Sequence, residues 1–248
     1  MLELQHISYT VEQDGEKKDI LQDVNLTIKE RFVAITGPNG GGKSTLAKVI
    51  AGIITPTEGR ILLDGEDITG LNVTDRARRG ISFAFQQPVR FKGLRVKDLL
   101  MLATGRDHDM ADACKYLSEV GLCARDYIDR ELNDSLSGGE MKRIEIAMTL
   151  ARGTKLNIFD EPEAGIDLWS FQSLIHVFEE MRRKTDGSIL IISHQERILN
   201  IADKIAYIRD GRLEQYGTRD EILPELLHSV DDAACRVLTD KMEVKANA

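Results

Sequence analysis

The 248-residue sequence has few cysteines and lacks a long hydrophobic run. Cys114, Cys123 and Cys235 are odd in number with no close pair, which excludes a disulfide framework and a zinc site and is typical of reduced thiols in the cytosol. No apolar stretch approaches the roughly 18–20 residues of a membrane span. The first residues lack the basic and apolar regions of a secretory signal. We therefore expect a cytoplasmic protein that is not itself inserted in a membrane.

The sequence also lacks an excess of positive charge. It has 41 acidic residues against 33 lysines and arginines, for a net charge of −8. Because contacts to nucleic-acid phosphates require Lys and Arg, we do not expect nucleic acid to be the main partner. No repeat, low-complexity tract or Pro/Ser-rich linker is present, and the length suits one large α/β domain or two small ones. We interpret residues 1–248 as a single domain.

A glycine-rich segment is the strongest signal that is present. An apolar run at residues 32–35 precedes it, and a helical pattern follows in which Leu46, Val49, Ile50 and Ile53 share one face. Strand, glycine loop and helix are the context of a phosphate-binding loop, in which backbone N–H groups and the helix dipole hold the anion. Lys43 is expected to reach the β- and γ-phosphates, and Ser44 to ligate Mg²⁺. The segment comprises Gly37, Pro38, Asn39, Gly40, Gly41, Gly42, Lys43, Ser44 and Thr45.

A second glycine-containing segment begins a helix expected at residues 139–152. Ser137 is a good N-cap, and Gly138 and Gly139 before Glu140 leave backbone N–H groups exposed. This pattern predicts a second anion site at a helix N-terminus. The alternative is a helix start that is merely capped.

Two acids follow a predicted buried strand at residues 155–159. Asp160 is expected to hold Mg²⁺ through water, and Glu161 to act as the general base that polarises an attacking water. Ligands of open α/β sheets bind at the carboxyl ends of strands, which favours this interpretation. The alternative is a strand that ends in two solvated acids. Asn157 interrupts the apolar run, so its side chain needs a partner or an edge position.

Two further polar residues follow predicted strands. His194 comes after the strand at residues 188–193, and Gln86 after the strand at 81–85. If these strands are neighbours, both side chains lie beside the acids. We then expect His194 to contact the γ-phosphate and to orient the attacking water. Gln86 would reach Mg²⁺ or the same water. A structural histidine and an ordinary polar loop residue are the alternatives.

The remaining pattern predicts the arrangement around these motifs. Strands at residues 2–10 and 20–28 form an antiparallel hairpin that turns within 12–18, and Thr74 caps a short helix stopped by Gly80. Helical periodicity replaces strand signals over 89–153, as an insertion into a core of about 1–88 and 154–229. We expect helices at 96–103, 110–120, 139–152 and 168–183, a terminal hairpin at 204–215 and a polar tail at 230–248.

The order of these motifs resembles the ATPase domain of ABC proteins over residues 1–217. This resemblance implies an α/β P-loop NTPase fold of the ABC ATPase type: a mainly parallel central sheet, an N-terminal antiparallel β part and an inserted helical subdomain. It implies that Mg·ATP is bound and hydrolysed, that Tyr9 stacks on the adenine, and that Asp167 lies in a loop crossing between protomers. It also implies an ATP-induced head-to-tail homodimer, in which Ser137–Glu140 of one copy close on the nucleotide held by the other.

Three segments resemble more narrowly SufC, the ATPase family of the Suf iron–sulfur assembly system: residues 81–94, 137–143 and 194–199. This resemblance implies that ATP-driven closing of the dimer changes the conformation of a soluble SufB/SufD-like scaffold on which iron–sulfur clusters are assembled. The scaffold would dock near residues 87–96, with Val89, Phe91 and Leu94 as apolar anchors or as core contacts. The sequence departs from better-known SufC proteins at 160–171, which leaves the partner open.

The alternative function is the ATP-binding subunit of a membrane transporter. A DNA-associated structural protein would carry a long coiled coil, for which the insertion is too short. A non-hydrolysing binding module is disfavoured by Glu161 and His194.

Overall fold

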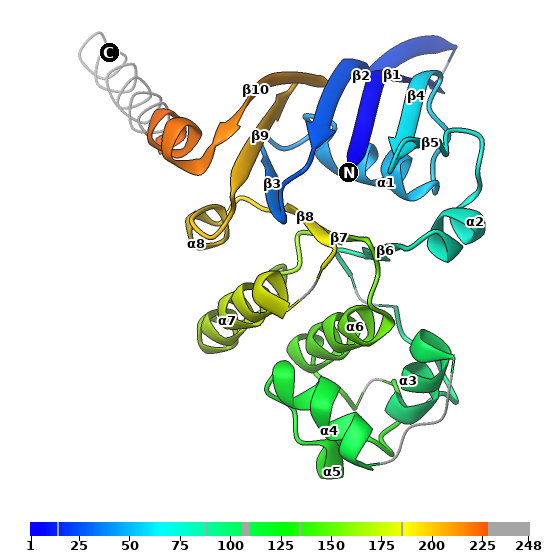
Figure 1. The fold of residues 1–248 in the computed structure, drawn as a ribbon, viewed down its shortest axis with the longest axis vertical. Helices are drawn as coiled ribbons and strands as arrows, with labels where there is room; N and C mark the ends of the chain where they lie inside the picture. The colour runs from blue at the N-terminus through cyan, green and yellow to red at the C-terminus, as the bar shows by residue number, and fades with distance from the viewer. Residues whose placement is uncertain (14, 88, 106–109, 134, 185, 228–248) are drawn as a thin grey trace, which may run out of the picture.

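The computed structural model describes residues 1–227 except 14, 88, 106–109, 134 and 185. Two β-sheets and a group of helices make up this part of the chain (Figure 1). An antiparallel sheet built from N-terminal residues lies at one end, and most of the helices lie at the other. The central sheet runs between them and carries the motifs identified from the sequence.

The N-terminal sheet is antiparallel, as predicted, with the order β2-β1-β4-β5. The β1–β2 hairpin is longer than expected, because pairing continues to Gln13 opposite Glu16. The chain turns within residues 12–18 as predicted, but both strands extend further than the predicted 2–10 and 20–28. The strands are β1 (Leu2–Gln13), β2 (Glu16–Ile28), β4 (Glu58–Leu63) and β5 (Glu66–Asp67).

The central sheet has the order β10-β9-β3-β8-β7-β6. Five of its strands are parallel, and β10 pairs antiparallel with β9 at one edge. The mainly parallel sheet and the terminal hairpin are thus confirmed, and β9 also pairs with β3. The strands are β3 (Phe32–Thr36), β6 (Ile81–Ala84), β7 (Leu156–Asp160), β8 (Ser188–Ile192), β9 (Lys204–Arg209) and β10 (Arg212–Thr218).

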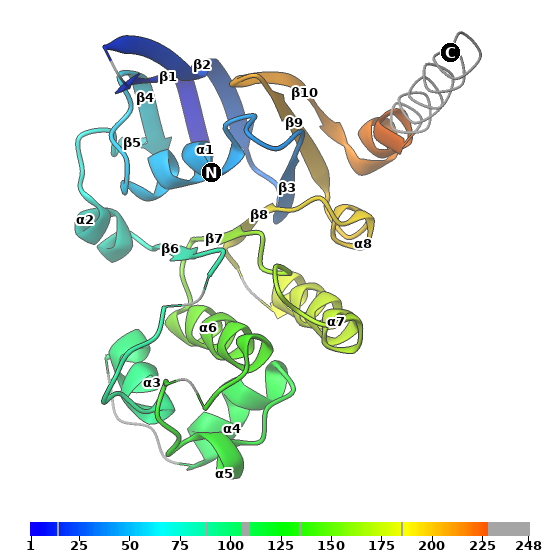
Figure 2. The ribbon, with the colours of Figure 1, turned by 180° about the vertical axis from the view of Figure 1, so that it is seen from behind.

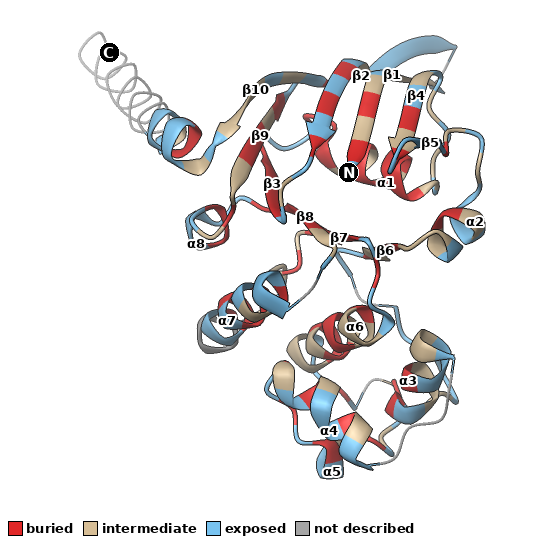
Figure 3. Ribbon diagram, viewed as in Figure 1, coloured by how far each residue is buried: buried red, intermediate tan, exposed pale blue. Residues whose placement is uncertain are grey.

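The central strands are mostly apolar because both faces of the sheet are covered. In β3, Val33 and Ile35 pack into a cluster with the first helix and the N-terminal sheet, whereas Phe32 and Ala34 belong to the cluster on the other face. All five residues of β3 and of β7 are buried (Figure 3). Figure 2, which views the molecule from behind, shows α6 (Gly138–Arg152) and α7 (Leu168–Lys184) on the face opposite α1 (Lys43–Ala51).

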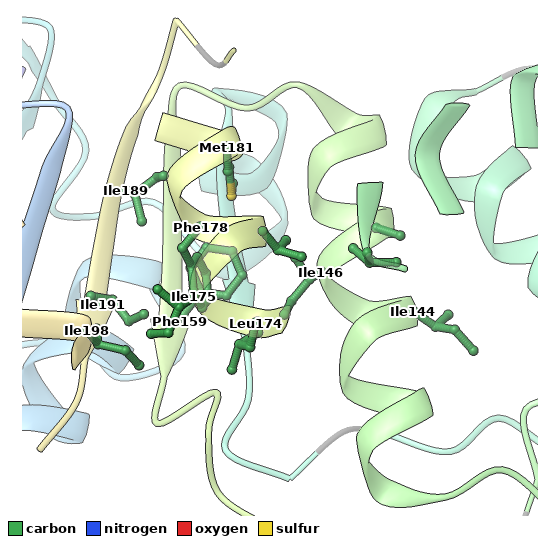
Figure 4. Packing of buried hydrophobic residues seen from close by; sticks show 14 of the residues in the cluster. Ile144, Ile146, Phe159, Leu174, Ile175, Phe178, Met181, Ile189, Ile191 and Ile198 are labelled. Carbon is green, nitrogen blue, oxygen red and sulfur yellow. The ribbon is translucent and has the colours of Figure 1, made fainter. Parts of the chain in front are cut away.

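Aromatic rings pack between α7 and the face of the central sheet that lies opposite α1 (Figure 4). Phe178 of α7 (Leu168–Lys184) makes an edge-to-face contact with Phe159 of β7, at 5.1 Å between ring centroids, and another with Phe32 at 6.3 Å. Such pairs add to the stabilisation from burial alone. The contacts fix α7 directly beneath the strands that end at Thr36 and Asp160.

The helix after the glycine loop, α1 (Lys43–Ala51), lies between the two sheets. Leu46, Val49 and Ile50 are buried as predicted. Ile53 is not part of this face: the helix ends at Gly52, whose φ of 76° turns the chain, and Ile53 is 39% exposed.

A buried arginine closes the C-terminal end of α1. Arg76 belongs to α2 (Val73–Arg78) and donates hydrogen bonds to the carbonyls of Val49 and Ile50 at 2.7 and 2.9 Å, and to those of Leu71 and Thr69. These bonds satisfy carbonyls that a helix end leaves open. The cap of α2 itself is Asn72, whose Oδ1 accepts from the Asp75 N–H, so the prediction of Thr74 was wrong.

Four helices lie between β6 and β7: α3 (Val96–Thr104), α4 (Met110–Glu119), α5 (Ala124–Tyr127) and α6 (Gly138–Arg152). The three long ones match the predicted ranges closely, whereas α5 is too short for a periodic signal. After β8, the short helix α8 (Glu196–Leu199) precedes β9, and residues 219–227 are helical. The predicted tail at 230–248 lies outside the described residues. None of the helices in the described part of the chain has the length and apolarity of a bilayer span.

Asn157 finds its partners inside the sheet. It is buried in β7, and its Oδ1 accepts hydrogen bonds from the hydroxyls of Ser82 and Thr154 at 3.0 and 2.6 Å. Because the amide is satisfied, it does not disturb the apolar run around it.

The Arg76 contacts predict a loss of stability on substitution. Arg76→Met keeps much of the side-chain volume but removes the donors, so we expect the free energy of unfolding to fall by about 3 kcal/mol, measured by urea denaturation. Arg78→Ala is the matched control, because the Arg78 side chain lies in the same helix and is 75% exposed. Equal effects of both substitutions would contradict the capping role of Arg76.

Candidate active site

The predicted site residues meet at one edge of the central sheet. Strands β3, β8, β7 and β6 are consecutive parallel neighbours, so their carboxyl ends lie side by side. The glycine loop follows β3, His194 follows β8, Asp160 and Glu161 end β7, and Gln86 follows β6. This common edge is where open α/β sheets bind ligands.

The glycine loop is shaped by close backbone packing. Gly37 has φ of 135°, and a side chain there would collide with the Ile208 carbonyl. Gly42 has φ of 99°, and a Cβ would lie 2.8 Å from the Ile20 carbonyl oxygen. Only glycine fits both positions. Because Gly42 is the N-cap of α1 and no acidic residue lies in the first turn, the amides at this helix start are available to an anion.

Lys43 is held inside this loop. Its side chain donates hydrogen bonds to the carbonyls of Gly37 and Pro38 at 2.9 and 2.8 Å. Burial lowers the pKa of Lys43, while Glu161 and Asp160 act in the opposite direction. The ammonium group is therefore placed in the loop before any phosphate arrives.

Ser44 and Asp160 form a pair of oxygen donors that suits Mg²⁺. The Ser44 hydroxyl donates to Asp160 Oδ1 at 2.8 Å, which joins α1 to the end of β7. Asp160 is buried, and this burial raises the pKa of its carboxyl, as does Glu161. Hydroxyl and carboxylate oxygens are the ligands Mg²⁺ takes together with phosphates. Within the described residues no group of three or more His, Cys, Asp or Glu side chains could hold a metal ion.

Glu161 lies between the two other predicted catalytic residues. Gln86 Nε2 donates to Glu161 Oε2 at 2.6 Å, and His194 Nε2 is 3.5 Å from Glu161 Oε1. Burial lowers the pKa of His194, and the charge of Lys43 lowers it further, whereas Glu161 raises it. Glu161 itself has φ of 45°, a left-handed conformation rare outside glycine and typical of functional positions.

Ser137 and Glu140 begin α6 with reciprocal hydrogen bonds. Ser137 Oγ accepts from the Glu140 N–H at 3.2 Å, and Glu140 Oε2 accepts from the Ser137 N–H at 2.7 Å. A side chain at Gly138 or Gly139 would meet nothing within 4 Å, so packing inside this chain does not require glycine there. The structure does not bring this segment to the glycine loop, because the described hydrogen bonds of Ser137 and Glu140 stay within the helical insertion.

Tyr9 and Asp167 occupy the surroundings of the site. Tyr9 on β1 pairs with Leu21 on β2, and Leu21 Cδ2 lies within 2.9 Å of where a Cβ of Gly42 would stand. Tyr9 is thus close to the start of α1 and half-buried. Asp167 is exposed, and its carbonyl accepts from the Phe171 N–H at the start of α7.

Two residues that contact the backbone next to Gln86 were not predicted from the sequence. Lys142 and Glu145 of α6 hold both backbone groups of Phe85: the Lys142 ammonium donates to its carbonyl, and its N–H donates to Glu145 Oε1 at 3.1 Å. Lys142 is 1% exposed, and burial raises the pKa of Glu145 despite the opposing effect of Lys142. In the sequence this pair looks like an ordinary surface ion pair, so no local signal marks it. It fixes the backbone immediately before Gln86.

Exposed apolar residues line a groove beside Gln86. The groove has a volume of about 350 Å³, and Phe85, Val89, Phe91 and Leu102 on its walls are between 39% and 65% exposed. Val89 and Phe91 therefore lie at the surface, as expected of anchors. Leu94 packs against the core of the helical insertion and is a core contact.

The fold and the site together define a P-loop nucleoside triphosphatase. A family model described as ABC transporter matches residues 21–164, and the chain belongs to this family. It is an ATPase that uses ATP with Mg²⁺. The predicted fold class, activity and cofactors are thereby confirmed.

Relatives and solved structures agree with this assignment. The chain is 42% identical over 214 residues to an uncharacterized ABC transporter ATP-binding protein of Methanocaldococcus jannaschii, covering 83% of this chain and 85% of that protein. It is 31% identical to the lipopolysaccharide export system ATP-binding protein LptB of Haemophilus influenzae, covering 84% and 88%. A dimeric ATP-binding cassette in a post-hydrolysis state, bound to ADP and Pi, superimposes with a TM-score of 0.79 at 25% identity, covering 88% and 99%.

The electrostatics of the site predict how His194 titrates in the nucleotide-free protein. Because burial and Lys43 both disfavour the imidazolium, we expect its midpoint below the ordinary value of 6.5, measured by NMR of the ring protons. Lys43→Met removes a positive charge and should raise the midpoint, whereas Glu161→Gln removes a negative charge and should lower it. A midpoint above 6.5, or shifts of the same sign in both variants, would contradict this arrangement.

Proposed function

We propose that this chain is the ATP-binding subunit of a membrane transporter and that two copies close head to tail on Mg·ATP. We infer the dimer from the separation of the site into two parts that lie apart in one chain. A complete phosphate loop and catalytic cluster lie at one edge of the sheet, while a second helix N-terminus with two unobstructed glycines lies in the insertion, apart from them. A second copy is the natural source of the missing half, and the superimposed cassette is a dimer.

The positions of the glycine-loop residues and their neighbours indicate their roles. The loop amides and Lys43 bind the phosphates, and Ser44 and Asp160 hold Mg²⁺, which neutralises phosphate charge when bound. Tyr9 stacks on the adenine beside the start of α1. The N-terminal dipole of the partner's α6 is stabilised by the same nucleotide, so ATP favours the closed dimer.

Hydrolysis depends on the residues around Glu161. Glu161 accepts a proton from the attacking water, and its Oε1 faces His194, which orients that water. The lowered pKa of His194 keeps the ring neutral near pH 7, so that Nε2 accepts or donates a hydrogen bond without repelling Lys43. Gln86, bonded to the other oxygen of Glu161, links the base to the groove. Asp167 lies in the loop that faces the second copy.

We infer that the groove beside Gln86 receives the partner that ATP moves. Contiguous exposed apolar residues mark interaction sites, and here they adjoin Phe85, whose backbone α6 holds on both sides. Motion of α6 on dimer closure would therefore reach the groove and Gln86 together. The relatives described as transporter ATP-binding proteins support a membrane partner.

A soluble Suf-type scaffold is the second candidate for this groove. The observation that favours it is the SufC-like segment at residues 81–94, which supplies Phe85, Val89 and Phe91 to the groove wall. The names of the relatives give it no support. Both candidates use the same surface and the same ATP cycle, so the identity of the bound protein separates them.

The assignment of the base predicts the behaviour of Glu161→Gln. We expect ATP binding to persist, kcat to fall by about 10²–10⁴-fold because no carboxylate accepts the proton, and a stable dimer to accumulate with ATP. Phosphate release and size-exclusion chromatography measure these effects. Glu179→Gln, at an exposed carboxylate of α7, is the control. Wild-type turnover in Glu161→Gln would exclude Glu161 as the base.

The groove predicts a substitution that separates docking from hydrolysis. Leu102→Glu places a charge on the most exposed apolar residue of the wall, so we expect it to reduce partner binding at least about tenfold while basal ATPase activity is unchanged. The full chain is cross-linked in its native cells and purified, and the attached protein is identified. An integral membrane protein supports a transporter, and a soluble cysteine-bearing scaffold supports the Suf function. Leu227→Glu, at an exposed leucine far along the chain, is the control, and equal binding by both variants would exclude the groove.

A further inference from the structure

A buried carboxyl group behind the catalytic cluster has no role in the mechanism above. Glu163 lies in the turn after β7, and its Oε1 accepts a hydrogen bond from the Ser193 hydroxyl. Its Oε2 is buried and has no hydrogen-bond partner among the residues that the structure describes. A buried polar atom without a partner is costly in a folded protein and calls for an explanation.

Ser193, the partner of Glu163, is the residue immediately before His194. It is fully buried, and its N–H donates to the Ile35 carbonyl of β3 at 3.1 Å. Its hydroxyl also accepts from the Gln195 N–H at 3.0 Å. Ser193 thus holds the backbone on both sides of His194 and, through Glu163, attaches it to the turn after β7.

The same turn contains Glu161 in its left-handed conformation. The turn is closed by hydrogen bonds from Ala164 N–H to the Glu161 carbonyl and from Ile166 N–H to the Glu163 carbonyl, at 3.0 and 3.1 Å. A sparsely populated backbone conformation persists only where its surroundings hold it. The bond from Glu161 N–H to the Ile192 carbonyl and the Glu163–Ser193 contact both attach this turn to the end of β8.

We propose that Glu163 is a positioning residue, which through Ser193 holds Glu161 and His194 in their mutual arrangement and connects the loop carrying Asp167 to that frame. The inference rests on the proposed function, because it takes Glu161 and His194 as the hydrolytic pair. In this proposal Glu163 acts through Ser193 and does not contact the reacting atoms. Its contribution is to keep Glu161 Oε1 within 3.5 Å of His194 Nε2.

The test compares variants of the full-length protein in steady-state ATPase assays. Glu163→Ala removes the acceptor, so we expect kcat to fall up to about 10²-fold with KM for ATP unchanged, because a small misplacement of catalytic groups costs this much. Glu163→Gln keeps an oxygen that accepts from Ser193 and should recover most of kcat. Ser193→Ala should lower kcat like Glu163→Ala, and the double variant should be no worse than either single one.

Stability and base assignment are measured on the same samples. If Glu163→Ala does not fold, the pair Glu163→Gln and Glu163→Gln/Ser193→Ala carries the test, with a loss of kcat expected only in the second. Wild-type kcat in Glu163→Ala, a matched rise in KM, or no rescue by glutamine would overturn the positioning role. In that event a Glu161→Gln variant that still blocks turnover leaves the proposed function intact, whereas its normal turnover would refute the proposed function instead.

Discussion

The structure depends on the burial of both faces of the central parallel strands. Val33 and Ile35 face α1 and the N-terminal sheet, whereas Phe32 and Ala34 face α6 and α7, and β8 alternates in the same way. Because both faces are covered, most residues of these strands are apolar, and the buried Asn157 is satisfied internally. The strands can present polar groups only where they end. The loops at their carboxyl ends therefore carry the charged site.

That site concentrates charges that are poorly matched without a ligand. Asp160 is buried beside Glu161, and Lys43 is surrounded by carbonyls rather than paired directly with either acid. Burial shifts the pKa of Asp160 upwards and that of Lys43 downwards, so it disfavours the charged form of each group. A metal ion beside the acids and phosphates beside Lys43 would relieve both penalties. The free energy of ligand binding would therefore include the stabilisation of these two charged groups.

Two series of hydrogen-bonded residues lead away from the site. One runs from Glu161 through Gln86 to the groove, and the Lys142–Glu145 pair keeps Phe85 in register with α6 along the way. The other runs from the turn after β7 through Glu163 and Ser193 to His194. Each combines a bond between two side chains, Gln86–Glu161 or Ser193–Glu163, with bonds to backbone groups that hold the adjoining segment. A movement of α6 or of the turn would therefore change the position of Glu161.

Much of this molecule is determined by local sequence alone. The apolar strands, the long helices and the glycine loop follow from periodicity and from residues such as Gly37 and Gly42 that no other side chain can replace. The residues at the strand ends, Gln86, Asp160, Glu161 and His194, were also identifiable, because parallel strands share an edge. The sequence alone misplaced Ile53, the cap of α2 and the length of the first hairpin, since each depends on what neighbours pack nearby.

Only the tertiary structure decided which ordinary-looking side chains are buried in long-range contacts. Arg76, Lys142 and Glu163 belong to polar stretches that the sequence presents as surface, and their importance comes from burial against backbone carbonyls, amides or a hydroxyl far away in the chain. The strand order is likewise a tertiary fact, because it places His194 between the glycine loop and the acids. Local pattern records what a segment can form, and long-range packing sets the partners that give a side chain its role.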